Sequence, residues 1–181
     1  DSIIFISKWL QKYFINLGLK KESYIINMAC DNKIFYPLQN KKFNTKIKLV
    51  THHNSENWLK GFDIYQQIDN WLHKDTKSRD KFEFIYCGDI NSRYINNCTT
   101  HVHKTNIINV ANLLRTCDIY ITATRNEPGG NHHVEAASCG LPILYHNDGG
   151  GVVEMCQNYG EGFNNFDEFK INLMKIVDDY N

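Results

Sequence analysis

Two kinds of hydrophobic pattern alternate along the chain: short apolar, β-branched or aromatic runs, and longer stretches with apolar residues three or four positions apart. The short runs predict β-strands over residues 2–7, 24–27, 46–51, 82–87, 119–122 and 142–145. The longer stretches predict helices over residues 8–17, 61–73, 107–116, 131–139, 151–157 and 167–180. The strand at 82–87 is apolar without strict alternation, as expected of a sheet that is covered on both faces. The sequence therefore predicts an α/β fold with a doubly wound, Rossmann-like parallel sheet.

Residues 33–45 interrupt this alternation. They are polar, contain Pro37 and show neither helical nor strand periodicity. We interpret them as a linker between a first βα piece and the main sheet.

The composition argues against several classes of protein. Twenty basic residues balance twenty acidic ones among 181 residues, so the chain lacks the basic surplus typical of proteins that bind nucleic acid. No apolar run approaches the ~20 residues of a membrane span, and the first residues lead directly into a predicted strand, so we expect no transmembrane segment and no signal peptide. The six cysteines are scattered and form no C-x-x-C pair, which indicates reduced thiols and favours a cytoplasmic location.

The loop after the predicted strand at 119–122 carries the strongest chemical signal. Gly129 and Gly130 precede a helix start, where backbone amides can approach and hold a phosphate. Glu127 and Glu135 are eight positions apart, so both could flank a ligand at the carboxyl ends of the strands. Because carboxylates accept hydrogen bonds from hydroxyl groups, the pair suits a polyhydroxylated ligand. A glycine loop before a helix is, on its own, also typical of a plain turn.

The same segment resembles the E-x7-E signature of the retaining GT-B glycosyltransferases of family 4, the glycosyl transferases group 1. The helix and the G-L-P-I run at 140–143 that follow Glu135 are similar to the next elements of that family. Further motifs match in the family's order: D-x3-F-x-P at 31–37, K-G-x-D at 60–63, G-D at 88–89 and G-G-x-x-E at 150–154. Together the matches cover nearly the whole chain.

This resemblance implies one half of an enzyme. The family has two Rossmann-like domains with the active site between them. Residues 1–45 resemble the last βα unit of the amino-terminal, acceptor-binding domain plus the linker, and residues 46–181 resemble the donor-binding domain. The implied reaction transfers a hexosyl group from a nucleotide-diphosphate sugar to a glycan, lipid or other acceptor, as in polysaccharide biosynthesis. The missing acceptor domain would be the partner of this chain, could supply a peripheral membrane contact, and would be needed for activity.

The resemblance also assigns roles to individual positions. Lys60 and Glu127 would be catalytic, with Lys60 at the diphosphate and Glu127 at the sugar, and Glu135 would hold the ribose hydroxyls. The other implied donor-binding residues are Gly129, Gly130, Asn131, His53 and Asn54. Because the chain contains no Asp-x-Asp pair, we expect no metal and no cofactor, with the charge of the leaving diphosphate met by Lys60 and backbone amides.

The chain departs from the family's pattern in the loop after the first donor-domain strand. The family's arginine is absent from residues 52–59, and either His53 or Asn54 could take its place. His52 and His53 could line the phosphate pocket, or they could equally be ordinary strand-end residues. The adjacent His132 and His133 would point about 100° apart on a helix, so we expect one exposed and one packed side chain and no zinc site.

Two other functions stay open. A non-catalytic module that holds a nucleotide sugar would carry the same donor-site residues. Another GT-B enzyme, such as a nucleotide-sugar epimerase or a phosphorylase, would share the fold. Epimerases generally lack the combination of E-x7-E with K-G-x-D, and phosphorylases need a cofactor lysine and a longer chain. No motif found in the chain specifies the sugar, the base, the acceptor or the oligomeric state.

Overall fold

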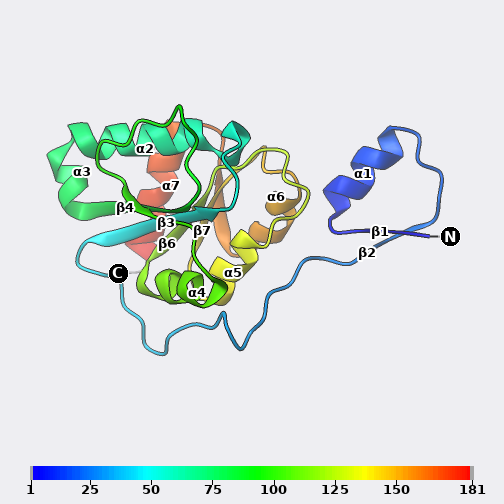
Figure 1. The fold of residues 1–181 in the computed structure, drawn as a ribbon, viewed down its shortest axis with the longest axis horizontal. Helices are drawn as coiled ribbons and strands as arrows, with labels where there is room; N and C mark the ends of the chain where they lie inside the picture. The colour runs from blue at the N-terminus through cyan, green and yellow to red at the C-terminus, as the bar shows by residue number, and fades with distance from the viewer. Residues whose placement is uncertain (1, 180–181) are drawn as a thin grey trace.

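The main part of the molecule is a six-stranded parallel sheet, seen in a computed structural model that describes residues 2–179 (Figure 1). The strands are β3 (Ile47–His53), β4 (Phe82–Gly88), β5 (Thr100–Val102), β6 (Ile119–Thr122), β7 (Ile143–His146) and β8 (Gly160–Phe163). Their order is β5-β4-β3-β6-β7-β8, and all neighbours are parallel. The chain adds β4 and β5 on one side of β3, then returns to add β6, β7 and β8 on the other. The predicted doubly wound sheet is therefore confirmed.

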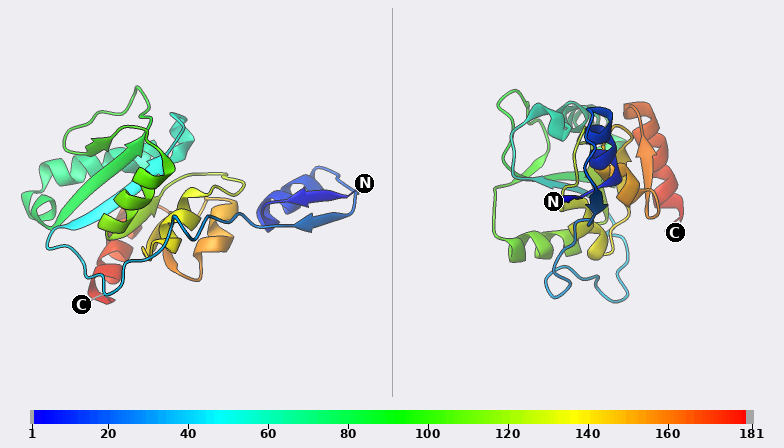
Figure 2. Two further views of the ribbon diagram at one scale, coloured as in Figure 1. Left: turned by 60° about the horizontal axis from the view of Figure 1, so that its bottom comes forward. Right: turned by 90° about the vertical axis from the view of Figure 1, so that its right-hand side faces the viewer.

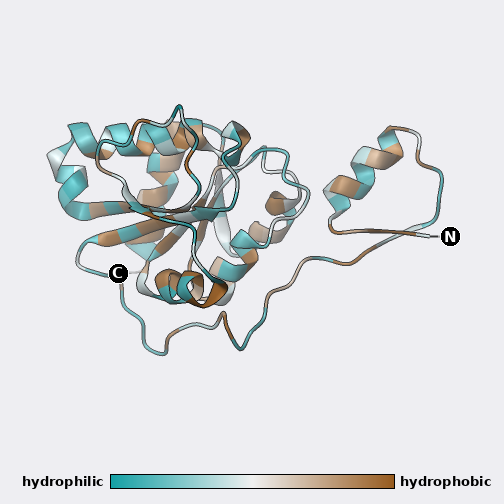
Figure 3. Ribbon diagram, in the orientation of Figure 1, coloured by the Kyte–Doolittle hydropathy of each residue, from teal (hydrophilic) through white to brown (hydrophobic). Residues whose placement is uncertain are grey.

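Helices cover both faces of this sheet. The helical elements that follow β3 are η1 (Trp58–Lys60), α2 (Phe62–Lys74), α3 (Thr76–Lys81), α4 (Ile107–Thr116), α5 (His132–Ser138), α6 (Gly151–Cys156) and α7 (Phe166–Asp179). The buried residues of α2 and α7 belong to one hydrophobic core, and those of α4, α5 and α6 belong to a second. The molecule thus has three layers, with the apolar strands in the middle one (Figure 3).

Successive strand residues serve the two cores in turn. Leu49 and Phe84 pack with α2 and α7, whereas their neighbours Val50 and Ile85 pack with α4 and α5. This alternation explains why the strands carry near-continuous apolar runs, since both faces of each strand are buried.

Residues 2–25 form a separate small unit. β1 (Ile3–Phe5) and β2 (Ser23–Ile25) make a two-stranded parallel sheet, with α1 (Lys8–Asn16) between them in the chain. Figures 1 and 2 show this unit beyond one end of the main body, with a long linker running along the outside of the molecule to β3. The linker has no helix or strand, as predicted, and Phe35 anchors it in the core of α4 and α5.

The elements differ from the sequence-based expectations mainly at the edges of the main sheet. β5 and β8 were not predicted, because each is short and β8 contains two glycines, so neither has a hydrophobic run. α3 was also missed, since its six residues are polar and its only signal is the N-cap Asp75. The predicted end of the last helix, residue 180, lies outside the described residues. The helices of residues 2–179 include none that is long and apolar enough to cross a membrane.

The small unit should be the least stable part of the molecule. Its sheet has only two strands, and Ile4 and Tyr24 are 61% and 52% exposed, so little apolar surface holds it together. We expect amide hydrogens of β1 and β2 to exchange at least tenfold faster than those of the central strand β3. Hydrogen exchange on a dilute, monomeric sample measures this. Equal protection of Phe5 and Val50 would contradict the prediction.

Candidate functional site

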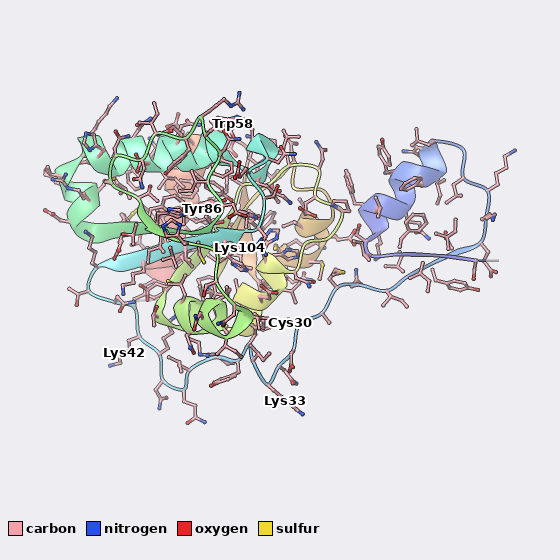
Figure 4. The ribbon with its side chains drawn as sticks, viewed as in Figure 1. Cys30, Lys33, Lys42, Trp58, Tyr86 and Lys104 are labelled. Atoms are coloured by element: carbon pink, nitrogen blue, oxygen red, sulfur yellow. The ribbon has the colours of Figure 1, made fainter. Side chains whose placement is uncertain are left out.

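Two adjoining cavities lie at the carboxyl ends of β3, β4 and β6. The larger has a volume of about 350 Å³, and its lining includes Lys60, Glu127, Gly130, Asn131 and His132. The smaller, of about 170 Å³, is lined among others by Cys87, Lys104 and Val110. His52, Asn54 and Glu135 line both, so the two cavities meet at these three side chains. Lys104, which lines the smaller cavity, is labelled in Figure 4.

The predicted site residues mostly meet in these cavities. Lys60, Glu127, Glu135, His53, Asn54, Gly130 and Asn131 all line the larger one. Gly129 does not, because it is buried against Ile6 of the amino-terminal segment. A still larger cavity of about 520 Å³ lies between α1 and the loops before Glu127 and α6, and its lining contains none of the predicted site residues.

Lys60 and Glu127 form an ion pair across the larger cavity. The Lys60 ammonium donates to a carboxylate oxygen of Glu127, and both side chains are mostly buried. Lys60 is delivered by the turn at Gly61, whose φ of +100° and close approach to Ala123 leave no room for a Cβ atom. A glycine is therefore needed directly after Lys60, because only a residue without a Cβ atom lets η1 approach the end of β6 this closely.

A second ion pair fixes the same two loops to each other, and the sequence analysis did not identify it. Arg125 donates two hydrogen bonds of 2.7 Å to the two carboxylate oxygens of Asp63, and its backbone N–H donates to the Leu59 carbonyl. Burial raises the pKa of the Asp63 carboxyl, but the hydrogen bonds and charge of Arg125 outweigh burial and hold the pKa below its usual value. The pair therefore stays ionised and connects the loop of Lys60 with the loop of Glu127.

The loop of Glu127 is also held by its backbone. The Glu127 N–H donates to the Gly149 carbonyl, and the Glu127 carbonyl accepts from the Gly151 N–H. Gly150 has a φ of +70°, and a Cβ atom there would lie 2.7 Å from the Glu127 carbonyl oxygen. The glycines after β7 thus permit a close backbone pairing that fixes the carboxylate-bearing loop.

Glu135 is paired with His52. The Nε2 atom of His52 at the end of β3 lies 2.8 Å from a carboxylate oxygen of Glu135 in the first turn of α5. His52 is 9% exposed, and its other ring nitrogen, Nδ1, is buried without a hydrogen-bond partner. This pairing was also not predicted, because the two residues are 83 positions apart.

The His53 side chain lies on the opposite face of the sheet from that of His52, and its ring is neutral. Burial, followed by the charges of His52 and Lys60, lowers the pKa of His53 well below 6.5. Its Nε2 atom lies 3.0 Å from the Tyr65 hydroxyl, which already accepts from the Thr51 hydroxyl and from a backbone N–H. The Nε2 atom also lies 3.2 Å from the Thr51 hydroxyl, so the His53 ring contacts two hydroxyl groups. His53 offers the cavity a neutral imidazole, not the positive charge of an arginine.

The expectation that one of His132 and His133 is exposed is wrong. His132 is 9% exposed and His133 is fully buried. The short helix α5 contacts α4, α6, β6 and β7, so both histidines at its start are packed. Burial lowers the pKa of both rings, that of His133 to about 4. His132 has Thr122 as a partner at 3.1 Å, whereas neither ring nitrogen of His133 has one.

Nothing in this arrangement resembles a metal centre. Within residues 2–179, no three His, Cys, Asp or Glu side chains are grouped so that they could hold a metal ion. All six cysteines are unpaired, and burial raises the pKa of several of their thiols, as for Cys117 and Cys156 to about 12. Cys117, Cys139 and Cys156 are packed in the core of α4, α5 and α6, whereas Cys87 lines the smaller cavity.

Comparison with protein families gives one match. The family model described as "Glycosyl transferases group 1" matches residues 86–168, which include Glu127 and Glu135 but not Lys60. No curated protein sequence matches the chain.

Solved structures share the fold over nearly the whole chain. Sucrose-phosphate synthase from Thermosynechococcus elongatus superposes with a TM-score of 0.78 and 14% identity over 99% of this chain and 49% of that protein. Anabaena HepE, solved in complex with UDP and glucose, superposes with a TM-score of 0.70 and 17% identity over 97% of this chain and 52% of that protein. The C-terminal domain of LpcC, a glycosyl transferase group 1 family protein from Francisella tularensis, superposes with a TM-score of 0.62 and 13% identity. The match covers 83% of this chain and 89% of that domain. The chain thus spans about half the length of the first two proteins and has the fold of glycosyltransferase halves.

The buried histidines should make the stability depend on pH. His53, His132 and His133 have pKa values below 6.5 in the folded state, so protons bind preferentially to the unfolded chain as the pH falls below 6.5. The free energy of unfolding should then fall by about 1 kcal/mol per pH unit for each such histidine. Urea unfolding between about pH 7.5 and 5 measures this.

His133 provides the matched comparison. Because it has no hydrogen bond to lose, His133→Leu should fold and should show a shallower decline of stability with falling pH than the wild type. An unchanged slope in this variant, or stability that rises as the pH falls, would contradict the assignment of neutral buried histidines.

Proposed function

We propose that this chain is the donor-binding half of a retaining glycosyltransferase of group 1, in family 4, which transfers a hexosyl group from a nucleotide-diphosphate sugar. The observation that carries this proposal is that Lys60, Glu127 and Glu135 line one cavity at the carboxyl ends of adjacent parallel strands. The matched family model and the fold of the similar structures support it.

The two cavities suit the parts of a nucleotide sugar. The smaller, bounded by Cys87 and Val110, suits a base, and the larger suits a diphosphate and a sugar. Glu135 at their junction would accept hydrogen bonds from the ribose, and Glu127 would contact the sugar. The complex of HepE with UDP and glucose supports a ligand of this class.

Lys60 would stabilise the departing diphosphate without a metal or another cofactor. Charge develops on the diphosphate as the anomeric C–O bond breaks, and a positioned ammonium group lowers the energy of that charge. Backbone amides of Gly130 and Asn131 would add donors. The arginine of the family has no charged replacement among the candidates, because His53 is neutral and Asn54 is an amide. Asn54 would serve as a neutral donor to the second phosphate.

Residues 1–45 would belong with an amino-terminal acceptor domain, and residues 46–181 would form the donor domain. The exposed apolar side chains of the small unit, among them Ile4, Leu17 and Tyr24, support a partner that covers them. That domain would bind the acceptor, so this chain alone should bind donor but not turn it over. A cytoplasmic location and a role in polysaccharide biosynthesis, with membrane contact only through the acceptor domain, fit this proposal.

A binding module without catalysis is the second candidate. Among residues 2–179, Lys60 is the one lysine or arginine that lines the larger cavity, and Lys104 lines the smaller one. A single cation at the larger cavity favours this candidate, because a weaker electrostatic environment would hold a nucleotide sugar yet stabilise the leaving group less. Glu127 distinguishes the two functions, since a module needs no carboxylate beside the reacting carbon.

The two carboxylates should affect different parts of the ligand. Loss of hydrogen bonds to a charged acceptor costs about 1.5–3 kcal/mol, or roughly 10- to 150-fold in affinity. Glu135→Ala should weaken UDP and UDP-glucose alike by that order, whereas Glu127→Ala should weaken only UDP-glucose. Calorimetry measures these affinities, and the same titrations with GDP, ADP and their glucose conjugates test the other bases. EDTA should leave the affinities unchanged, because the proposed site holds the ligand without a metal. The control is Glu56→Ala, an exposed carboxylate in the neighbouring loop.

Lys60→Ala should weaken both ligands, and more so at low ionic strength, because its contribution is electrostatic. The matched control is Lys74→Ala, an exposed lysine at the end of α2. If Lys60→Ala and both carboxylate variants bind every ligand as the wild type does, the donor-site proposal is wrong.

A further inference from the structure

His52 occupies a special place among the side chains of the site. It lines both cavities, it contacts Glu135, and it is nine-tenths buried. Neither the matched motifs nor the roles proposed above use it. Its position at the junction of the cavities is where the ribose of a nucleotide would lie between base and diphosphate.

The geometry indicates which nitrogen of the His52 ring carries the proton. An ionised carboxylate can only accept, so the 2.8 Å contact with Glu135 requires the proton to be on Nε2 of His52. The other nitrogen, Nδ1, is then a bare acceptor, which fits its buried position without a partner. The opposite tautomer would bury an unpaired N–H and leave two acceptors facing each other, at a cost for both.

The His52 side chain is itself held in place. The Tyr120 hydroxyl lies 3.3 Å from the backbone nitrogen of His52, and the two rings meet edge to face at 5.5 Å. The centroid of the His132 ring lies 6.3 Å from that of His52. A donor fixed in this way can define the position of a more mobile group.

Glu135 depends on that donor. Its carboxylate has one hydrogen-bond partner among the described residues, which is His52. With one oxygen bound to His52, the other oxygen remains available to hydroxyl groups at the cavity junction. Without His52 the long side chain would be free to adopt several rotamers.

We infer that His52 is a positioning residue that orients the Glu135 carboxylate toward the 2′-hydroxyl of the ribose and thereby sets the preference for ribonucleotides. The inference rests on the proposed nucleotide-sugar function. It predicts that His52 controls discrimination at the ribose and not affinity in general.

The test measures discrimination. UDP, GDP and ADP are titrated by calorimetry into the full chain, each beside its 2′-deoxy form. The wild type should bind the ribonucleotide at least about tenfold more tightly. In His52→Leu that ratio should fall toward one, through weaker binding of the ribonucleotide, with the deoxy form bound as before. His52→Gln, which keeps a donor, should retain part of the ratio. In Glu135→Ala the additional change His52→Leu should have no further effect.

The control is His146→Leu, a buried histidine at the end of β7 that lines neither cavity. It should keep the wild-type ratio. An equal loss for both nucleotide forms in His52→Leu, or an unchanged ratio, overturns the inference while Glu135→Ala still tests the proposed function. If the wild type binds no nucleotide, the proposed function fails and the inference fails with it.

A measurement on the unmodified protein covers the case in which His52→Leu does not fold. Nitrogen-15 NMR of the histidine rings should find the His52 proton on Nε2. A proton on Nδ1 alone would overturn the inference, because the ring could not then donate to Glu135.

Discussion

The site depends on the reversal of strand order between β3 and β6. The chain leaves β3 toward β4 on one side, and later enters β6 on the other side of β3. The loops that follow these two adjacent strands therefore run in opposite directions and leave a crevice at their carboxyl ends. The segment of Lys60 and the segment of Glu127, 67 positions apart in sequence, meet there because no crossover helix can lie between them.

Tyrosine hydroxyls make the floor of this crevice rigid. The Tyr65 hydroxyl on α2 accepts from Thr51 of β3 and from the backbone of Ala123 after β6. The Tyr120 hydroxyl of β6 lies against the backbone of His52. Burial raises the pKa of Tyr65 to about 12, so its hydroxyl remains a neutral donor and acceptor. These bonds join α2 to β3 and to the end of β6, in addition to the strand pairing and the Arg125–Asp63 ion pair.

The local pattern of the sequence predicted the elements that pack and the loops that meet, but not the partners within the site. The central strands were predictable because both of their faces are buried, as at Leu49 and Val50. Edge strands such as β8 lack that pattern, and their pairing is decided by β7. Arg125 with Asp63, and His52 with Glu135, join residues 62 and 83 positions apart. Such pairs follow from the three-dimensional path of the chain, which no local periodicity encodes.

The amino-terminal unit is connected to the loop of Glu127 by few but specific bonds. The Ser7 hydroxyl donates to the Pro128 carbonyl, one residue beyond Glu127. The Glu154 carboxylate accepts from the backbone N–H groups of Lys8 and Trp9, so α6 caps the start of α1. A carboxylate at a helix N-terminus is favourable for both its hydrogen bonds and its charge. Glu154 lies in the first turn of α6, and Gly151, the first residue of that helix, donates to the Glu127 carbonyl. The small unit and the backbone that holds Glu127 are therefore joined through the start of α6.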